Sequence, residues 1–60
     1  MDAQARLTAI LDEYVTEEVK ASSFLGQVVT DAIEHVIEEY DLEDPDLIDK
    51  LIYSTDKYFN

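Results

Sequence analysis

The 60-residue sequence contains no cysteine and no tryptophan, and it has only one histidine, one glycine and one proline. The absence of cysteine excludes disulfides and thiolate-bound metal ions, and a single histidine is too few for a histidine-rich zinc site. A single glycine excludes a glycine-rich phosphate-binding loop. No stretch reaches the roughly 18 apolar residues of a membrane-spanning helix, and the N-terminus lacks the basic and apolar regions of a signal peptide. We therefore expect a cytoplasmic protein that uses no metal ion or other cofactor.

Basic residues are scarce as well. Four Lys and Arg stand against fifteen Asp and Glu, which gives a net charge of −11. Because phosphate binding depends on Lys and Arg, this composition excludes direct binding to nucleic acid and to an anionic membrane. A binding partner should instead be a basic protein. Charge of one sign also opposes folding through self-repulsion, so we expect the acidity to bring a benefit that outweighs this cost.

Apolar residues are plentiful, at 47% of the chain, and they are distributed along its whole length. Disordered acidic segments lack such residues, so the chain should fold. Its length allows a single domain, residues 1–60. A domain of this size buries only about 60% of its unfolded surface, and without disulfides or a metal ion the common source of extra stability is self-association.

Three segments, about 2–20, 24–40 and 45–59, carry apolar residues three and four positions apart, which predicts amphipathic helices. No strand-like alternation of useful length occurs. Short connections between the helices favour antiparallel neighbours. The predicted fold class is therefore all-α: a small three-helix bundle, or a helical hairpin plus a third helix whose core is completed by homodimerisation.

Residues at the predicted helix ends support these boundaries. Asp2 is expected to cap the first helix, and Ser22 or Ser23 the second. Asp44 followed by Pro45 is the clearest start signal, because Asp is a good N-cap and Pro is favoured at the first helical position.

The second segment has the widest apolar face. At about 100° per residue, its apolar side chains cover about half of the helix circumference. This width suits the central helix of a bundle, or a helix that also contacts a second chain. The residues predicted to form the core or a dimer interface are Leu25, Val29, Ile33, Val36 and Tyr40.

The other two segments give further expectations. Glu18 falls within the apolar face of the first segment, where it reaches solvent near the helix end or meets a cation. Tyr53 points away from the apolar face of the third segment, among charged residues, a composition typical of contact surfaces. The apolar face of that third segment comprises Leu47, Ile48, Leu51, Ile52, Thr55, Tyr58 and Phe59.

The polar side of the second segment is entirely acidic. Asp31, Glu34 and Glu38 lie opposite its apolar face, and residues 24–40 contain no Lys or Arg. An i,i+4 step rises about 6 Å, which is close to two phosphate steps of about 3.4 Å along a DNA strand. This row could therefore imitate a phosphate backbone. The alternatives are an ordinary solvated face or adaptation to a salt-rich cytoplasm.

An acidic run follows at residues 38–46. It does not match a calcium-binding EF-hand loop, because a loop starting at Asp41 would place Asp46 where glycine is required. We interpret the run as an exposed corner that continues the acidic side of the second helix. His35 lies one turn from both Asp31 and Glu39, a spacing that makes a weak metal site and is more typical of a surface histidine.

No motif for catalysis is present, and three short helices offer little concave volume in which to desolvate carboxylates, so we do not expect an enzyme. In size and charge the chain resembles the small acidic inhibitors of phages and mobile elements. We predict a protein-interaction module, an inhibitor that occupies a basic and nucleic-acid-binding surface in the manner of a DNA mimic. The alternative is a structural or adaptor protein that homodimerises or docks a partner helix, with acidity serving solubility. The predicted partner-binding residues are Asp31, Glu34, Glu38, Glu39, Asp41, Glu43 and Tyr53.

Overall fold

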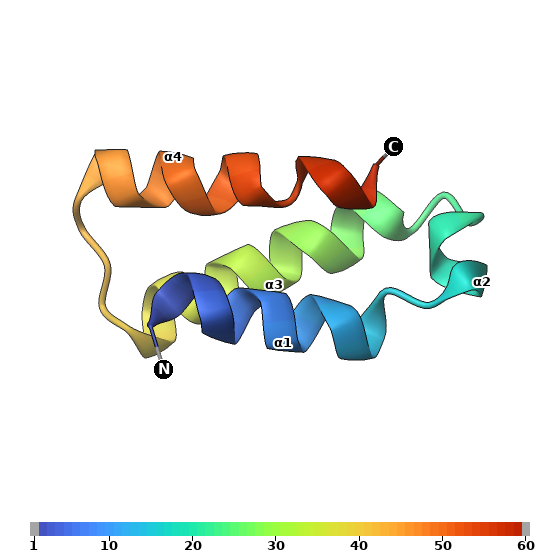
Figure 1. Ribbon diagram of the computed structural model, residues 1–60, viewed down its shortest axis with the longest axis horizontal. Helices are drawn as coiled ribbons and strands as arrows, with labels where there is room; N and C mark the ends of the chain where they lie inside the picture. The colour runs from blue at the N-terminus through green and yellow to red at the C-terminus, as the bar shows by residue number, and fades with distance from the viewer. Residues whose placement is uncertain (1, 60) are drawn as a thin grey trace.

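The computed structural model describes residues 2–59, and its ordered elements are all helical (Figure 1). No strand occurs among these residues. The all-α class and the helical bundle are as predicted. The elements are α1 (Ala3–Tyr14), α2 (Glu17–Lys20), α3 (Leu25–Glu39), α4 (Pro45–Ser54) and a short 3₁₀ helix, η1 (Asp56–Tyr58).

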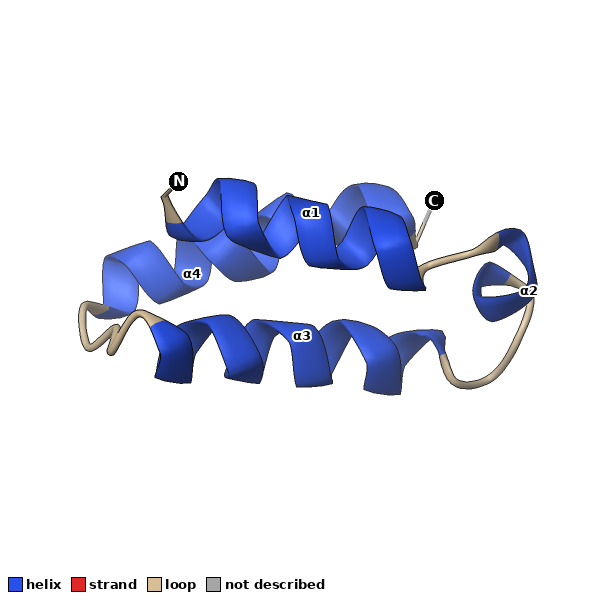
Figure 2. Cartoon of the chain, turned by 90° about the horizontal axis from the view of Figure 1, so that it is seen from below, coloured by secondary structure: helices blue, strands red, loops and turns tan. Residues whose placement is uncertain are grey.

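The three longer helices run up, down and up along an elongated body of 32 × 18 × 15 Å. α3 is antiparallel to both α1 and α4, and the short α2 lies at the end where the chain passes from α1 to α3 (Figures 1 and 2). The N-terminus and the connection between α3 and α4 lie together at the opposite end (Figure 1). Among the described helices, none is long and apolar enough to cross a membrane.

The core is small and draws on every long helix. Leu7, Leu11 and Val36 are the most completely buried large side chains, each below 2% exposed. Burial of such a side chain stabilises the folded state by about 1.5–3 kcal/mol. The whole buried cluster comprises Leu7, Leu11, Val15, Val29, Ala32, Val36, Leu51 and Tyr58.

The apolar face predicted for residues 45–59 is only partly buried. Leu51, Thr55 and Tyr58 are buried, whereas Leu47, Ile52 and Phe59 remain 46%, 44% and 51% exposed. The predicted face spans well over 100° of the helix surface, and α4 meets α1 and α3 through its middle alone. The residues at the edges of the predicted apolar face therefore remain exposed, and those at its centre are buried.

The first predicted helix is interrupted. α1 ends at Tyr14, Val15 leaves helical geometry with ψ at 84°, and the Thr16 hydroxyl accepts a hydrogen bond from the Val19 N–H at 3.2 Å. Thr16 thereby caps α2. Thr is a favoured N-cap residue, and the acids that follow it, Glu17 and Glu18, are stabilised by the positive end of the helix. The break places Val15 in the core and leaves Glu18 exposed to solvent, the first of the two outcomes expected for it. The continuous helix over 2–20 is a wrong prediction.

The predicted caps are confirmed for two helices out of three. Asp2 accepts a hydrogen bond from the Ala5 N–H at 2.8 Å, and Asp44 accepts one from the Asp46 N–H at 3.0 Å. α3 starts after Phe24 without a side-chain cap. Ser22 instead stabilises the turn between α2 and α3. Its hydroxyl donates a hydrogen bond to the Val19 carbonyl and accepts one from the Phe24 N–H.

α3 ends in a Schellman motif. The Leu42 N–H donates to the Ile37 carbonyl at 3.0 Å, and the Asp41 N–H donates to the Glu38 carbonyl at 3.2 Å. Asp41 takes a left-handed conformation with φ of 52°, the position at which most proteins place glycine. Ile37 and Leu42, the two positions between which this motif often has an apolar contact, both pack against the core cluster.

We expect Asp41→Gly to raise the free energy of unfolding by about 1 kcal/mol, because relief of the left-handed strain and loss of a negative charge beside the helix C-terminus together exceed the added chain entropy. Thermal denaturation should show this as a rise in Tm of about 4–8 °C. Asp41→Ala removes the same charge but keeps the strain, so it should be less stable than Asp41→Gly. Equal stability of the two variants would contradict a left-handed residue at this position.

A hydrogen bond ties η1 to α1. The Tyr58 hydroxyl donates to Asp12 Oδ1 at 2.8 Å, and the ring is buried at 8% exposure. Burial first, and then the hydrogen bond to Asp12, raise the pKa of Tyr58 from 10.0 to about 12. A phenol whose pKa is raised by folding adds stability that is fully present below pH 10 and is lost as the pH rises toward 12.

At neutral pH, Tyr58→Phe should lower the free energy of unfolding by about 1 kcal/mol through loss of the hydrogen bond. Above pH 10 the phenol of the unfolded chain ionises before that of the folded chain, so the difference from wild type should shrink to zero and then reverse as the pH approaches 12. Urea denaturation followed by circular dichroism at a series of pH values measures both effects. A difference that stays constant up to pH 12 would show that the Tyr58 hydroxyl is not the group responsible.

Candidate functional site

All fifteen acidic side chains are exposed, so none of them is consumed by the core. On α3 the predicted row of Asp31, Glu34 and Glu38 is present and faces solvent. Asp31 accepts a hydrogen bond from Gln27 Nε2 at 2.8 Å, which holds the first carboxylate of the row along the helix. We call these three residues the acidic row.

The acidic row continues into the connection between α3 and α4. Asp41 and Glu43 are exposed, and they lie at the end of the molecule that also carries the N-terminus of α1 (Figure 1). Asp44 is the N-cap of α4 and Asp46 lies in its first turn, where the positive end of the helix stabilises carboxylates. We call Asp41 and Glu43 the acidic corner.

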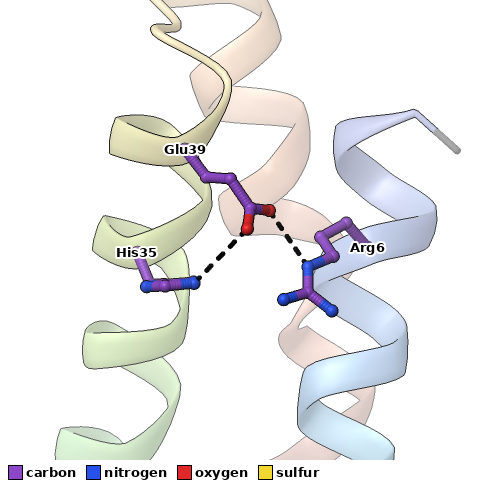
Figure 3. A network of polar contacts seen from close by, with 3 residues as sticks. All are labelled: Arg6, His35 and Glu39. Carbon is purple, nitrogen blue, oxygen red and sulfur yellow. Dashed lines mark hydrogen bonds and ion pairs between the residues drawn. The ribbon is translucent and has the colours of Figure 1, made fainter.

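Glu39 differs from its neighbours because it is paired within the chain. Its carboxylate lies between two nitrogen-bearing side chains from different helices, 3.0 Å from Arg6 Nε on α1 and 3.7 Å from His35 Nε2 on α3 (Figure 3). The hydrogen bond from Arg6 and the charge of Glu39 raise the pKa of the Arg6 guanidinium. Glu39 therefore joins α1 to α3, and its part in partner binding stays a prediction.

The remaining acids of the acidic row and acidic corner have no such cation. Within residues 2–59, Lys20 pairs with Glu17 at 3.9 Å, and no ion pair involves Asp31, Glu34, Glu38, Asp41 or Glu43. This is a concentration of negative charge that the fold does not use. Asp41 and Glu38 even lie near the C-terminus of α3, where the helix dipole disfavours anions.

The structure does not bring Tyr53 to the acidic row. Tyr53 is 71% exposed on α4, two residues from the buried Leu51 and two from the buried Thr55. At about 100° per residue this places its ring on the side of α4 that faces away from the bundle. Tyr53 is exposed as predicted, but it belongs to a separate surface.

The residues predicted for the core or a dimer interface serve the core of the single chain. Val29 and Val36 are buried, and Leu25, Ile33 and Tyr40 are partly buried against the same cluster. Their burial by α1 and α4 explains the wide apolar face of this helix, which lies in the middle of the bundle.

Two apolar hollows were not predicted from the sequence. One, of about 510 Å³, lies among α1, α2 and α3. Another, of about 340 Å³, lies where the start of α1 meets the end of α3 and the start of α4, beside the acidic corner. The only signal in the sequence was that Ile10 and Val28 stand at the edges of their apolar faces. The first hollow is lined by Ile10, Tyr14, Val19, Val28, Asp31, Ala32 and His35.

The arrangement offers little for chemistry on a bound metal ion. Within residues 2–59, no group of three or more His, Asp or Glu side chains converges in a geometry that could hold a metal. His35 is engaged with Glu39 rather than with Asp31. What the surface does offer is a set of fixed negative charges beside apolar hollows, an arrangement suited to binding.

Comparison of the chain with protein-family models, with known proteins and with solved structures gives no match.

Because the acidic row is not paired, neutralising one of its members should stabilise the fold. We expect Glu38→Gln to raise the free energy of unfolding by about 0.5 kcal/mol, through relief of repulsion with Glu34 and of the unfavourable helix-end position. The gain should shrink as NaCl rises from about 0.05 to about 0.5 M, because salt screens exposed charges. Glu43→Gln, outside any helix, is the matched control and should change stability less. An equal gain in the control would mean that net charge alone is responsible.

Proposed function

We propose that this protein is an acidic interaction module that inhibits a basic partner protein by occupying its cationic surface. The acidic row and the acidic corner supply the contact charges. The partner surface it fits best is one built for the phosphates of nucleic acid, so that the chain acts as a mimic of a nucleic-acid backbone. It carries no catalytic residues in this proposal.

The observation that supports the proposal is that these acids lie at positions where helix electrostatics and backbone geometry disfavour them. Glu34 and Glu38 repel each other at i,i+4 spacing, and Asp41 adds both left-handed strain and an unfavourable helix-end charge. Residues that break local rules without a gain in stability are typical of functional positions. A solvated face would gain by placing Lys among these acids, as i,i+4 pairs do.

The spacing of the acidic row supports the choice of partner surface. Asp31 to Glu38 spans seven residues, which corresponds to a rise of about 10 Å along the helix. Along the axis of a duplex, three phosphates of one strand rise by about 7 Å and four by about 10 Å. A surface that accepts a strand of phosphates can therefore accept these carboxylates, whose positions are fixed because α3 is held on two sides by α1 and α4.

The test is a double charge reversal, Glu34→Lys with Glu38→Lys, in a tagged protein used to capture partners from a bacterial lysate. We expect the wild type to retain a nucleic-acid-binding protein at about 0.1 M salt and to release it at about 0.5 M, as an interface with many charge contacts should. The double reversal should abolish capture. Excess duplex DNA should displace the partner from the wild type.

The matched control is Glu18→Lys with Asp49→Lys, which changes net charge by the same amount at exposed acids of α2 and α4. This control should still capture the partner. Circular dichroism shows whether both variants keep their helix content, so a loss of capture is not confused with unfolding. Capture that survives the reversal at α3, or that is lost equally in the control, would contradict the proposed surface.

A further inference from the structure

The hollow among α1, α2 and α3 is a groove on a side of the bundle that α4 does not cover. Ile10 and Val28 are partly buried on its two walls, and Ala32 is buried at its floor. Tyr14 stands at its edge with 59% of its surface exposed. The apolar groove is thus open, although the core cluster that α1 and α3 share lies directly beneath it.

The groove extends along α1 toward the N-terminus. A neighbouring hollow of about 230 Å³ shares Ile10, Tyr14 and His35 with it and adds Arg6 and Glu13. The ion pair between Arg6 and Glu39 crosses from α1 to α3 at this end (Figure 3). The lining residues run from Arg6 to Tyr14 on α1 and from Val28 to His35 on α3, so the groove extends about 12 Å along the helices, a little over two helical turns.

Carboxylates line both edges of the groove. Glu13 lies on the α1 side and Asp31 on the α3 side, and neither is ion-paired within residues 2–59. Arg6, the cation at one end, is already neutralised by Glu39. An occupant therefore meets an apolar floor between two negative edges, in a chain whose net charge is −11.

We infer that this groove binds an amphipathic, cationic helix of the partner protein. Its apolar side would lie over Ile10, Val28 and Ala32, and its Lys or Arg side chains would reach Glu13 and Asp31. Two antiparallel helices that accept a further helix in this way complete a four-helix arrangement. A second copy of this chain is disfavoured, because it would bring another net charge of −11 onto the same acidic edges.

This inference rests on the proposed function but concerns a different surface from the acidic row, so the two are tested separately. The probe is a fluorescent 14-residue peptide of leucine and lysine that forms an amphipathic helix, and its reference is a peptide of the same composition in scrambled order. Fluorescence anisotropy should show the amphipathic peptide binding at least about tenfold more tightly than the scrambled one, because only the former presents an apolar face to the groove.

Two variants locate the binding. Tyr14→Ala with Val28→Ser should weaken binding of the amphipathic peptide about tenfold, since both residues line the groove. Tyr53→Ala is the control for the tyrosine substitution, because it removes an exposed tyrosine from the far side of α4, and it should bind like wild type. Thermal denaturation confirms that each variant is folded at the temperature of the assay.

Three outcomes would overturn the inference: equal binding of both peptides, unchanged binding by the groove variant, or a wild-type protein that is itself a dimer which the peptide dissociates. The last would assign the groove to a second copy. If the groove variant still captures the lysate partner while the reversal of Glu34 and Glu38 does not, the proposed function stands and the groove has no part in it. If the reverse holds, the groove is the interaction site and the acidic row is not.

Discussion

The contact of α1 with α3 through Leu7, Leu11 and Val36 is the interaction on which the rest of the molecule depends. Fifteen acids oppose compaction, and this small apolar cluster must outweigh their repulsion. It can do so because every acid remains exposed, where water and salt reduce the repulsion between charges. The Arg6–Glu39 pair adds a link between the same two helices, but an exposed ion pair of this kind contributes little beside the apolar contact.

With α1 and α3 fixed in this way, α4 serves a different purpose. It closes one side of the pair through Leu51 and through Tyr58 of the following η1, and the Tyr58 bond to Asp12 fixes its far end. The other side of the pair is left uncovered. Because α4 covers only one side of the α1–α3 pair, it stabilises α3, which can then hold carboxylates in fixed positions. The uncovered side keeps an open apolar groove beside these carboxylates.

The helices and the acidic row followed from the sequence because helical period and charge are local properties. Asp44 with Pro45 marks the start of α4 for the same reason. The errors arise where a neighbour decides the outcome. The period indicates the direction in which Leu47 and Ile52 point, but how wide a face α4 buries depends on the other helices. The break at Val15 was signalled locally by Thr16 and its acids, yet the apolar period continued through it. Neither Glu39's pairing with Arg6 nor the groove is a property of any single helix.

The acidic row and the groove would make different contributions to binding. Exposed carboxylates act over roughly a Debye length, about 8–10 Å, so they accelerate encounter with a basic partner and make it sensitive to salt. They discriminate poorly among basic proteins, because many surfaces carry Lys and Arg. An apolar groove with charged edges acts only on contact, and it selects a helix by the order of its residues rather than by its net charge. A chain of 60 residues has too little core to hold a large rigid interface. In the proposed function, the acidic row on α3 would attract a basic partner and the groove between α1 and α3 would select it, so that one small scaffold would supply both.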